Sequence, residues 1–347
     1  MTKTMKFGVL TKAHRAEIHE RPIPELGKYD ILVKQETCNI CTTDYGQWLG
    51  LREHQGYPMA GGHEGAGIIV AKGSKVDKKL QVGDRIAVTY QYCGECEACK
   101  TGLTSDCVNH KRGRSEDGYL GEFGFADYNV RDSRFVIKMN KDLPPAEAGF
   151  LEPLATVVNG IMRLRLQPKE TVVIIGAGTM GLVNAQAAKG YGARVIITEL
   201  MEKKIKTAEA MGFEVVDVSK NDPIEMVKAM TEGKGADAVI LAVGATKANQ
   251  QAIEMVKQLR GRVLLFAAGY PAPEINVDSN VIHYRKLELI GTFGADKADF
   301  IESARLLNEG IVDVAPLIET SFPLSELQKA YEAASTPGNY RVCVELS

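Results

Sequence analysis

A short apolar strand that runs into three glycines at a fixed spacing constrains the fold of this chain more than any other feature. The strand Thr171–Ile175 is followed by Gly176, Gly178 and Gly181, and then by the helical stretch LVNAQAAKG. The first glycine permits a tight turn, the second lets the backbone approach a pyrophosphate, and the third lets helix and strand pack closely. Phosphates bind at such a helix N-terminus because its free N–H groups and dipole favour negative charge. The pattern predicts a dinucleotide-binding βα turn.

An acidic residue stands where such a turn needs one. Glu199 follows the next strand, ARVIIT, at about the 20-residue spacing expected of a carboxylate that binds the adenosine ribose. An acid there repels a 2'-phosphate, which favours NAD over NADP. Lys203 and Lys204 follow closely and leave that preference open. A structural βα turn with a surface glutamate is the alternative interpretation, and the order of strand, glycines, helix and acid favours the cofactor site.

The pattern of expected strands and helices changes near Glu152, and this change predicts two domains. Before it, short β-type runs such as DILVKQE, GAGIIVAKG and RFVIKM are separated by Gly, Pro and Asp, as in a barrel or sandwich. After it, apolar strands alternate with helices, which is typical of a doubly wound parallel sheet. We expect an α/β protein with a catalytic domain at 1–155, completed by 295–347, and a nucleotide domain at 156–294.

Four cysteines fall close together in one loop. Cys93, Cys96, Cys99 and Cys107 form C-x2-C-x2-C-x7-C. Four thiolates can close a tetrahedral zinc shell, which leaves no position for water or substrate, so we expect a structural zinc. An iron–sulfur cluster is the main competitor, but its bacterial motif has a shorter last spacer and a following proline. Unliganded buried cysteines are the remaining alternative.

A second set of candidate metal ligands is spread along the chain. It comprises Cys38 and Cys41 in TCNICTTD, His63 and Glu64 in GGHEGAG, and Glu152 in LEPLA. One thiolate, one imidazole and one or two carboxylates would leave a zinc position open, as a catalytic zinc requires. Cys38 is interpreted as a buried small residue.

These motifs together resemble the zinc-containing medium-chain alcohol dehydrogenases, in particular the sorbitol and threonine dehydrogenase branch. The segment from Gly62 to Val76 resembles the zinc signature of that family, ICTTD its cysteine motif, the four-cysteine loop its structural lobe, and GAGTMG its nucleotide fingerprint. The resemblance covers nearly the whole chain. It implies a GroES-like β-barrel catalytic domain and a Rossmann domain, and hydride transfer between a secondary alcohol or polyol and NAD.

The same resemblance implies roles for individual residues. Cys41 and His63 would be zinc ligands, and either Glu64 or Glu152 the third; which of the two binds directly stays open. A zinc with a free position polarises an alcohol oxygen so that its proton leaves near neutral pH and hydride can pass to the nicotinamide. Thr43 resembles the hydroxyl residue that relays this proton, and N-capping of the next helix is its alternative role. Relatives carry a histidine relay residue where this chain has Gly46, so the proton exit differs.

Further residues resemble cofactor contacts of the family. They are Thr179 and Met180 in the glycine turn, Val243 and Gly244, Ala267, Ala268 and Gly269, Thr292 and Phe293, and Arg341 near the pyrophosphate. The resemblance also implies two zinc ions per chain, one catalytic and one structural, and a homodimer or homotetramer.

Charge and composition exclude other classes of function. A formal net charge of -2, without a run of lysine and arginine, argues against binding nucleic acid or anionic lipid. No stretch approaches the roughly 18 apolar residues of a membrane span, and the first ten residues lack the apolar core of a secretory signal. With clustered cysteines that favour a reducing compartment, we expect a cytoplasmic protein.

Two alternatives from other classes remain. A zinc-free enone or quinone reductase on the same scaffold would lack the liganding cysteine and histidine that Cys41 and His63 supply. A non-catalytic nucleotide-binding protein would keep the fold without turnover. The sequence identifies neither the alcohol nor the physiological direction, because fold and metal are shared by many such enzymes.

Overall fold

A computed structural model of the chain describes residues 4–110 and 113–346. These residues divide into two compact units. The first comprises the described residues of Met1–Ala155, Ala295–Gly310 and Val314–Ser347, and the second comprises Thr156–Gly294 with Ile311–Asp313.

The second unit is built on a six-stranded parallel sheet. Its strand order is β10-β9-β8-β11-β12-β13, in which the third strand along the chain lies at one edge and the sixth at the other. This is the doubly wound order of dinucleotide-binding domains. The strands are β8 Thr171–Ile175, β9 Arg194–Glu199, β10 Glu214–Asp217, β11 Ala238–Leu241, β12 Arg262–Leu265 and β13 Glu288–Gly291.

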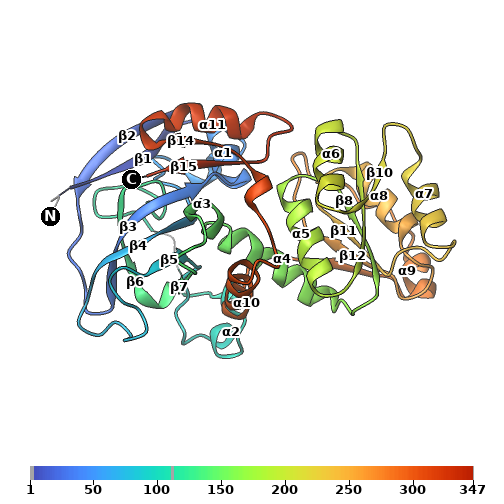
Figure 1. Ribbon diagram of the computed structural model, residues 1–347, viewed down its shortest axis with the longest axis horizontal. Helices are drawn as coiled ribbons and strands as arrows, with labels where there is room; N and C mark the ends of the chain where they lie inside the picture. Colours follow the sequence, from blue (N-terminus) through green and yellow to red (C-terminus); the bar gives the residue numbers. More distant parts are fainter. Residues whose placement is uncertain (1–3, 111–112, 347) are drawn as a thin grey trace. The chain divides into compact units, whose positions relative to one another are not determined.

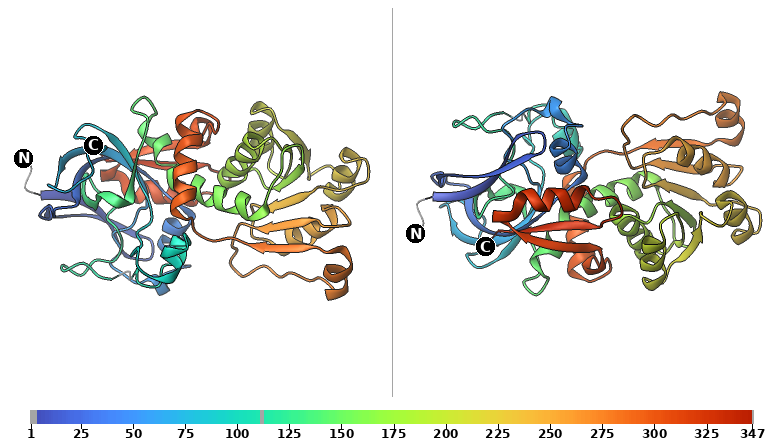
Figure 2. Two further views of the ribbon diagram at one scale, coloured as in Figure 1. Left: turned by 90° about the horizontal axis from the view of Figure 1, so that it is seen from below. Right: turned by 90° about the horizontal axis from the view of Figure 1, so that it is seen from above.

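Helices connect these strands and cover both faces of the sheet. In Figure 1, α5 and α6 lie on one side of the strands and α7, α8 and α9 on the other, and Figure 2 shows the same layers from two further directions. The central strands β8 and β11 are buried almost throughout, as expected for parallel strands covered on both faces. The helices are α5 Thr179–Gly190, α6 Glu202–Ala210, α7 Pro223–Met230, α8 Thr246–Met255 and α9 Ser279–Arg285.

A short segment far along the chain belongs to this second unit rather than to the first, to which the sequence analysis assigned it. The side-chain amide of Gln186 on α5 donates to the Asp313 carbonyl at 2.7 Å, and the Asp313 N–H donates back to the Gln186 oxygen at 2.8 Å. This reciprocal pair binds residues 311–313 to the helix that follows the glycine turn.

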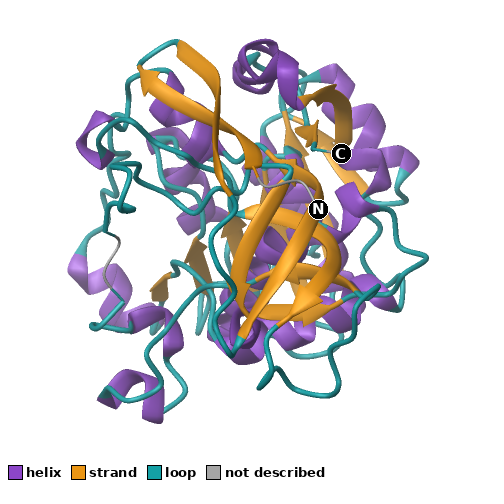
Figure 3. Cartoon of the chain, turned by 90° about the vertical axis from the view of Figure 1, so that its left-hand side faces the viewer, coloured by secondary structure: helices purple, strands orange, loops and turns teal. Residues whose placement is uncertain are grey.

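The first unit consists mainly of antiparallel strands. One sheet has the order β14-β15-β3-β4-β5-β7, with β6 paired to β3, and β1 and β2 form a separate hairpin. The strands of this unit face the viewer in Figure 3. They are β1 Thr4–Lys12, β2 Arg15–Pro22, β3 Asp30–Asn39, β4 Glu64–Lys72, β5 Arg85–Val88, β6 Tyr128–Asp132, β7 Val136–Lys138, β14 Ile318–Pro323 and β15 Arg341–Glu345.

The first unit also contains several short helices. They are α1 Thr42–Trp48, α2 Glu97–Lys100, α3 Pro145–Ala148, α10 Lys297–Asn308 and α11 Leu327–Ser335. The helix α4, Leu151–Leu164, contains the boundary between the two units. The last strand, β15, pairs with β3 in register Cys343 to Asn39, so the C-terminal segment completes the sheet that carries the cysteine motif. Among the described residues, no helix combines the length and the apolar character needed to cross a bilayer.

Candidate functional site

The starts of two elements, α1 and β4, meet at one point of the first unit. Cys41 is the N-cap of α1, His63 directly precedes β4, and Glu64 is the first residue of that strand. One ligand atom from each of these residues lies within 4.8 Å of the other two. The structure therefore brings together a thiolate, an imidazole and a carboxylate from segments about twenty residues apart.

Gly62 makes this approach possible. Its backbone has φ +90°, and an added Cβ would lie 2.8 Å from the backbone nitrogen of Phe125 and 3.0 Å from Sγ of Cys38. A side chain would therefore push the His63–Glu64 segment away from its neighbours. Cys38 itself is fully buried in the core and is not part of the ligand set, in agreement with its interpretation as a packing residue.

Asp44 is a positioning residue that the sequence analysis did not single out. Its carboxylate accepts the Cys41 N–H at 2.9 Å and the Gly62 N–H at 3.3 Å, and it lies 3.7 Å from Nδ1 of His63. A carboxylate behind Nδ1 leaves Nε2 available for a metal and fixes the ring orientation. The signal in the sequence was a carboxylate three residues after a helix N-cap, the spacing of a capping box.

The electrostatics of the cluster favour the metal-binding form of the cysteine. Burial alone would raise the pKa of the Cys41 thiol, but the hydrogen bond and charge of His63, together with Arg341, lower that pKa to about 7. Burial disfavours the charged form of His63, yet Asp44 and Cys41 raise its pKa well above the ordinary value. A thiolate is the form of cysteine that binds a metal.

Negative charge in the cluster exceeds what its neighbours offset. Glu64 is 0% exposed, and burial raises its pKa well above the ordinary value, with Cys41 and Glu152 adding to the shift and Arg341 opposing it. Neither carboxylate oxygen of Glu64 accepts a well-aligned hydrogen bond, although Arg341 lies 2.9 Å away. A buried carboxylate beside a thiolate and an imidazole is a donor set that a divalent cation would satisfy, so the residues present fit a zinc ion.

Glu152 lies close to this cluster but outside it. It is buried in the first turn of α4, and its carboxylate accepts a hydrogen bond from the hydroxyl of Tyr90. Its charge contributes to the raised pKa of His63 and of Glu64. Tyr90 is a second residue that the sequence analysis missed, because a lone tyrosine beside a strand carries no pattern.

Other residues of α1 divide into those near the cluster and those in the core. Thr43 is half-buried in the first turn of α1. Beside Gly46, one helical turn further on, the side chain of Arg52 passes at 3.5 Å from the position of an added Cβ. Trp48 stacks on Tyr331 with an interplanar angle of 5°, which is a packing role.

The four cysteines of the loop also come together. One sulfur from each of Cys93, Cys96, Cys99 and Cys107 lies within 4.8 Å of the others, and all seven cysteines of the chain are free thiols. The N–H groups of Glu95 and Cys96 both donate to Sγ of Cys93 at 3.3 Å and lower the pKa of that thiol to about 6. Crowding of sulfurs adds to desolvation in raising the pKa of Cys99 to about 12. A cation within the four sulfurs would relieve that crowding.

This lobe is anchored on α10. The carboxylate of Asp296, the N-cap of that helix, accepts the N–H and the hydroxyl of Ser105, both at 2.8 Å. The N–H of Lys297 donates to the hydroxyl of Thr104 at 2.8 Å. The lobe therefore has a defined position on the first unit, which suits a structural site.

In the second unit, the glycine turn has the geometry that a bound pyrophosphate needs. Gly176 has φ +100°, and an added Cβ on Gly181 would lie only 1.9 Å from the Gly176 carbonyl oxygen. Gly178 is the N-cap of α5. The turn is thus packed directly against the helix start, where free N–H groups favour an anion.

Glu199 ends the neighbouring strand β9 and faces this turn. Its carboxylate accepts three backbone N–H groups, from Ala177 at 2.6 Å, Leu200 at 2.7 Å and Met201 at 2.9 Å. These bonds fix the carboxylate beside the glycine turn. Lys204 also approaches, with Nζ 3.7 Å from the position of an added Cβ on Gly178.

The remaining predicted cofactor residues gather at the carboxyl end of the same sheet, with one exception. Val243 and Gly244 follow β11, the segment Ala267–Gly269 follows β12, and Thr292 and Phe293 follow β13; Thr179 and Met180 open α5. Ligands of doubly wound sheets bind at this end of the strands. Arg341 is the exception, because it lies in the first unit with its guanidinium against Glu64.

Comparisons with known proteins agree with this architecture. The family described as the alcohol dehydrogenase GroES-like domain matches residues 27–141, and that described as zinc-binding dehydrogenase matches residues 179–309. A sorbitol dehydrogenase of Halalkalibacterium halodurans is 31% identical over 91% of both chains. An L-threonine 3-dehydrogenase of Bacillus subtilis is 31% identical over 92% of both chains.

A solved structure extends the agreement to three dimensions. A protein of Sinorhizobium meliloti 1021, assigned to the zinc-binding dehydrogenases and solved with NADP bound, superimposes with a TM-score of 0.86 at 27% identity, covering 99% of each chain. With GroES-like and parallel-sheet units, and with identities above 30% over nine tenths of the chain, the protein belongs to the zinc-type medium-chain alcohol dehydrogenase family.

Proposed function

We propose that this protein is a zinc- and NAD-dependent dehydrogenase that interconverts a secondary alcohol or polyol and the matching ketone. The observation that carries the proposal is the cluster of Cys41, His63 and Glu64, whose three ligand atoms are one fewer than the four that zinc takes. Relatives named sorbitol dehydrogenase and L-threonine 3-dehydrogenase support an alcohol as substrate.

The residues of the first unit have separate tasks in this proposal. A zinc ion held there supplies Lewis acidity that makes an alcohol proton acidic near neutral pH. Cys41 and His63 hold the ion, and Asp44 keeps the imidazole oriented. The hydroxyl of Thr43 binds the reacting oxygen and takes the proton toward solvent. Because Gly46 provides no side chain for a relay, water or the cofactor ribose carries the proton onward.

A carboxylate completes the ligands of this first zinc ion. Glu64 is the direct carboxylate ligand in this proposal, because its oxygen lies within 4.8 Å of the ligand atoms of Cys41 and His63, and Glu152 does not belong to that cluster. A second zinc ion is held by the four cysteines of the loop and has no open position. We therefore propose two zinc ions per chain, with different chemistry.

We assign the second unit to NAD. The fixed carboxylate of Glu199 supports this choice, because it binds ribose hydroxyls and repels a 2'-phosphate. Lys204 near the turn and the NADP in the similar solved structure are reasons to measure both cofactors.

Two wider expectations belong with this function. Thiolate metal sites persist in a reducing compartment, which supports the cytoplasm. The strand β13 ends the sheet order, and none of its four residues is buried, so this edge is available to a second copy in a homodimer or homotetramer. Sedimentation of the purified protein measures the number of copies.

The test is an absorbance assay for NADH with polyols, diols, amino alcohols and simple alcohols, combined with zinc analysis. The wild type is expected to hold two zinc ions and oxidise at least one class. Cys41→Ser should hold one zinc ion and lose on the order of 10³-fold in kcat/KM, since several kcal/mol come from the metal. Cys343→Ala, a buried thiol in β15, is the matched control and should keep both zinc ions.

The same assay separates the alternatives. Reduction of enones by NADPH in a zinc-free protein would support a zinc-free reductase, in which the Cys41 and His63 pair has no task. One zinc ion per chain with NADH binding and no turnover would support a non-catalytic nucleotide-binding protein. Unchanged turnover in Cys41→Ser would contradict the proposal.

A further inference from the structure

Tyr90 forms a partly buried hydrogen bond that the roles assigned so far do not explain. The residue follows β5, and its hydroxyl donates to Oε1 of Glu152. Glu152 is only 5% exposed. A half-buried phenol therefore donates to a buried carboxylate next to the proposed metal site.

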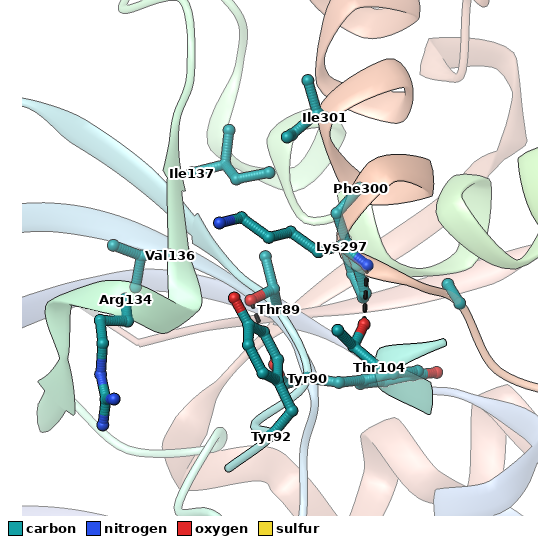
Figure 4. A pocket seen from close by; sticks show the side chains of 11 residues that line it. Thr89, Tyr90, Tyr92, Thr104, Arg134, Val136, Ile137, Lys297, Phe300 and Ile301 are labelled. Atoms are coloured by element: carbon teal, nitrogen blue, oxygen red, sulfur yellow. Dashed lines mark hydrogen bonds between the residues drawn. The ribbon is translucent and has the colours of Figure 1, made fainter. Parts of the chain in front are cut away.

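The ring of Tyr90 is held from the side. Phe300 on α10 packs edge-on against it, with ring centroids 5.1 Å apart and an interplanar angle of 80°. Tyr90 also forms part of the wall of a cavity of about 60 Å³, which Tyr92 and Lys297 line as well (Figure 4). The contact with Phe300 fixes one side of the ring, so a movement of the hydroxyl away from Glu152 would cost packing on that side.

The hydroxyl acts as a permanent donor. Burial raises the pKa of Tyr90 well above its ordinary value, and the charge of Glu152 adds to that effect. The charges of Cys41 and Glu64 also raise it, which puts Tyr90 in the electrostatic field of the metal ligands. In the structure the hydroxyl of Tyr90 is the donor and Oε1 of Glu152 the acceptor.

The position of Glu152 has a consequence for the metal. Its oxygen does not belong to the group of ligand atoms that lie within 4.8 Å of one another. Its charge nevertheless raises the pKa of both His63 and Glu64. If this carboxylate turned inward, the metal would have four protein ligands. A shell of four protein ligands is that of a structural zinc, which has no position for a substrate.

We propose that Tyr90 is a positioning residue, which restrains Glu152 outside the inner ligand shell and so keeps the fourth metal position free for the alcohol. This inference rests on the proposed zinc site. It gives the two neighbouring carboxylates different tasks, with Glu64 as ligand and Glu152 held in reserve.

The variant Tyr90→Phe tests this role because it removes only the hydroxyl and keeps the ring against Phe300. We expect the released Glu152 to reach the metal. Transfer of the catalytic zinc to a chelator should then slow about tenfold, the usual scale of changes around a metal's ligands. The value of kcat/KM should fall by a similar factor, mostly through a higher KM, because the substrate must displace a carboxylate.

The direction of the effect distinguishes positioning from simple support. Loss of a supporting hydrogen bond ordinarily weakens a metal site, so faster zinc release in Tyr90→Phe would overturn the proposal. A spectroscopic readout adds to this test. With Co²⁺ in the site, imidazole should shift the visible absorption of the wild type and, at the same concentration, leave that of Tyr90→Phe unchanged.

Two further variants complete the design. Tyr92→Phe removes the same atom from a ring that lines the same cavity and packs on Phe135, and it should release zinc at the wild-type rate. In Glu152→Gln the carboxylate that could bind the metal is gone, so adding Tyr90→Phe should leave the rate of zinc release at that of Glu152→Gln alone. A slower release in the double variant than in Glu152→Gln would contradict the role of Glu152.

Failure of this inference can be told apart from failure of the proposed function. If the wild type holds two zinc ions and oxidises alcohols while Tyr90→Phe behaves like it in zinc release and KM, only the positioning role is wrong. If the wild type binds zinc in the cysteine loop alone, the proposed function is wrong and the positioning role is rejected with it.

Discussion

The guanidinium of Arg341 lies 2.9 Å from the carboxylate of Glu64, and the two side chains are 6% and 0% exposed. Another of its nitrogens donates to the Ile40 carbonyl at 3.3 Å. The last strand of the chain thus supplies the cation beside a carboxylate that opens β4. The family resemblance implied that Arg341 lies near the pyrophosphate, whereas its contacts in the structure are with Glu64 and Ile40 of the first unit.

Replacing this arginine by methionine should destabilise the metal-free protein strongly. Removing one partner of a buried ion pair costs about 3–5 kcal/mol, because the other charge is left buried. With zinc bound, the metal offsets Glu64 and the loss should be smaller. Melting temperatures of Arg341→Met and wild type, measured with a chelator and with zinc, test this; equal losses in both conditions would refute it. An NADH titration of the same variant shows whether Arg341 also serves the cofactor.

Gly181→Ala should impair cofactor binding. The added methyl group would lie 1.9 Å from the carbonyl oxygen of Gly176, a backbone atom that cannot move without opening the turn. Overpacking of this kind costs roughly 1–3 kcal/mol, so we expect NADH to bind about tenfold more weakly or worse. Fluorescence titration measures the dissociation constant. Gly113→Ala, where an added Cβ meets nothing within 4 Å, is the control.

Glu199→Gln should reduce the preference for NAD. The amide keeps the size of the side chain but loses the charge that repels a 2'-phosphate, and one of its ends now faces a backbone N–H as a donor. A hydrogen bond to a charged group contributes about 1.5–3 kcal/mol, so the ratio of kcat/KM for NAD and NADP should fall at least about tenfold. Glu202→Gln, on the exposed surface of α6, should leave the ratio unchanged.

Asp237 should contribute stability that depends on pH. Its carboxylate accepts the Thr171 N–H at 2.9 Å and the Lys257 ammonium at 2.7 Å, which ties the start of β8 to that of β11. Burial would raise the pKa of Asp237, but these two partners hold it below 3.8. Since the folded-state pKa is depressed, the stabilisation is present above about pH 4 and is lost as the pH falls through the folded-state value.

Asp237→Asn should therefore lower the melting temperature at pH 7 by the equivalent of about 1 kcal/mol, and the difference from wild type should shrink below pH 4. Calorimetry at pH 7, 5 and 3.5 measures the trend. A difference that stays constant across these pH values would show that the charge of Asp237 is not involved.

Local patterns were sufficient to predict the elements that position the cofactor. Short local patterns indicate these elements: runs of apolar residues indicate the strands β8, β9, β11 and β12, and the glycines after β8 indicate the turn. The edge strand β13 was not predicted, because its four residues include an exposed glutamate and none is buried. A short exposed strand owes its structure to its neighbour rather than to its own pattern.

The clustering of the candidate metal ligands could be predicted from the sequence, but the residues that support them could not. Cys41, His63 and the four loop cysteines belong to motifs with fixed spacing. Tyr90 and Asp44 acquire their roles from side chains distant in the sequence, such as Glu152 for Tyr90 and His63 for Asp44. Single-sequence patterns do not report such tertiary contacts.

The bonds of Asp44 have a consequence for how the site is loaded. One carboxylate fastens the start of α1 to the segment before β4, so the thiolate and the imidazole are held at binding distance by the protein alone. Little of the binding free energy of an incoming ion is then lost in ordering the chain. Capture of zinc should be a single fast step, while the fold of the surrounding strands stays as it was.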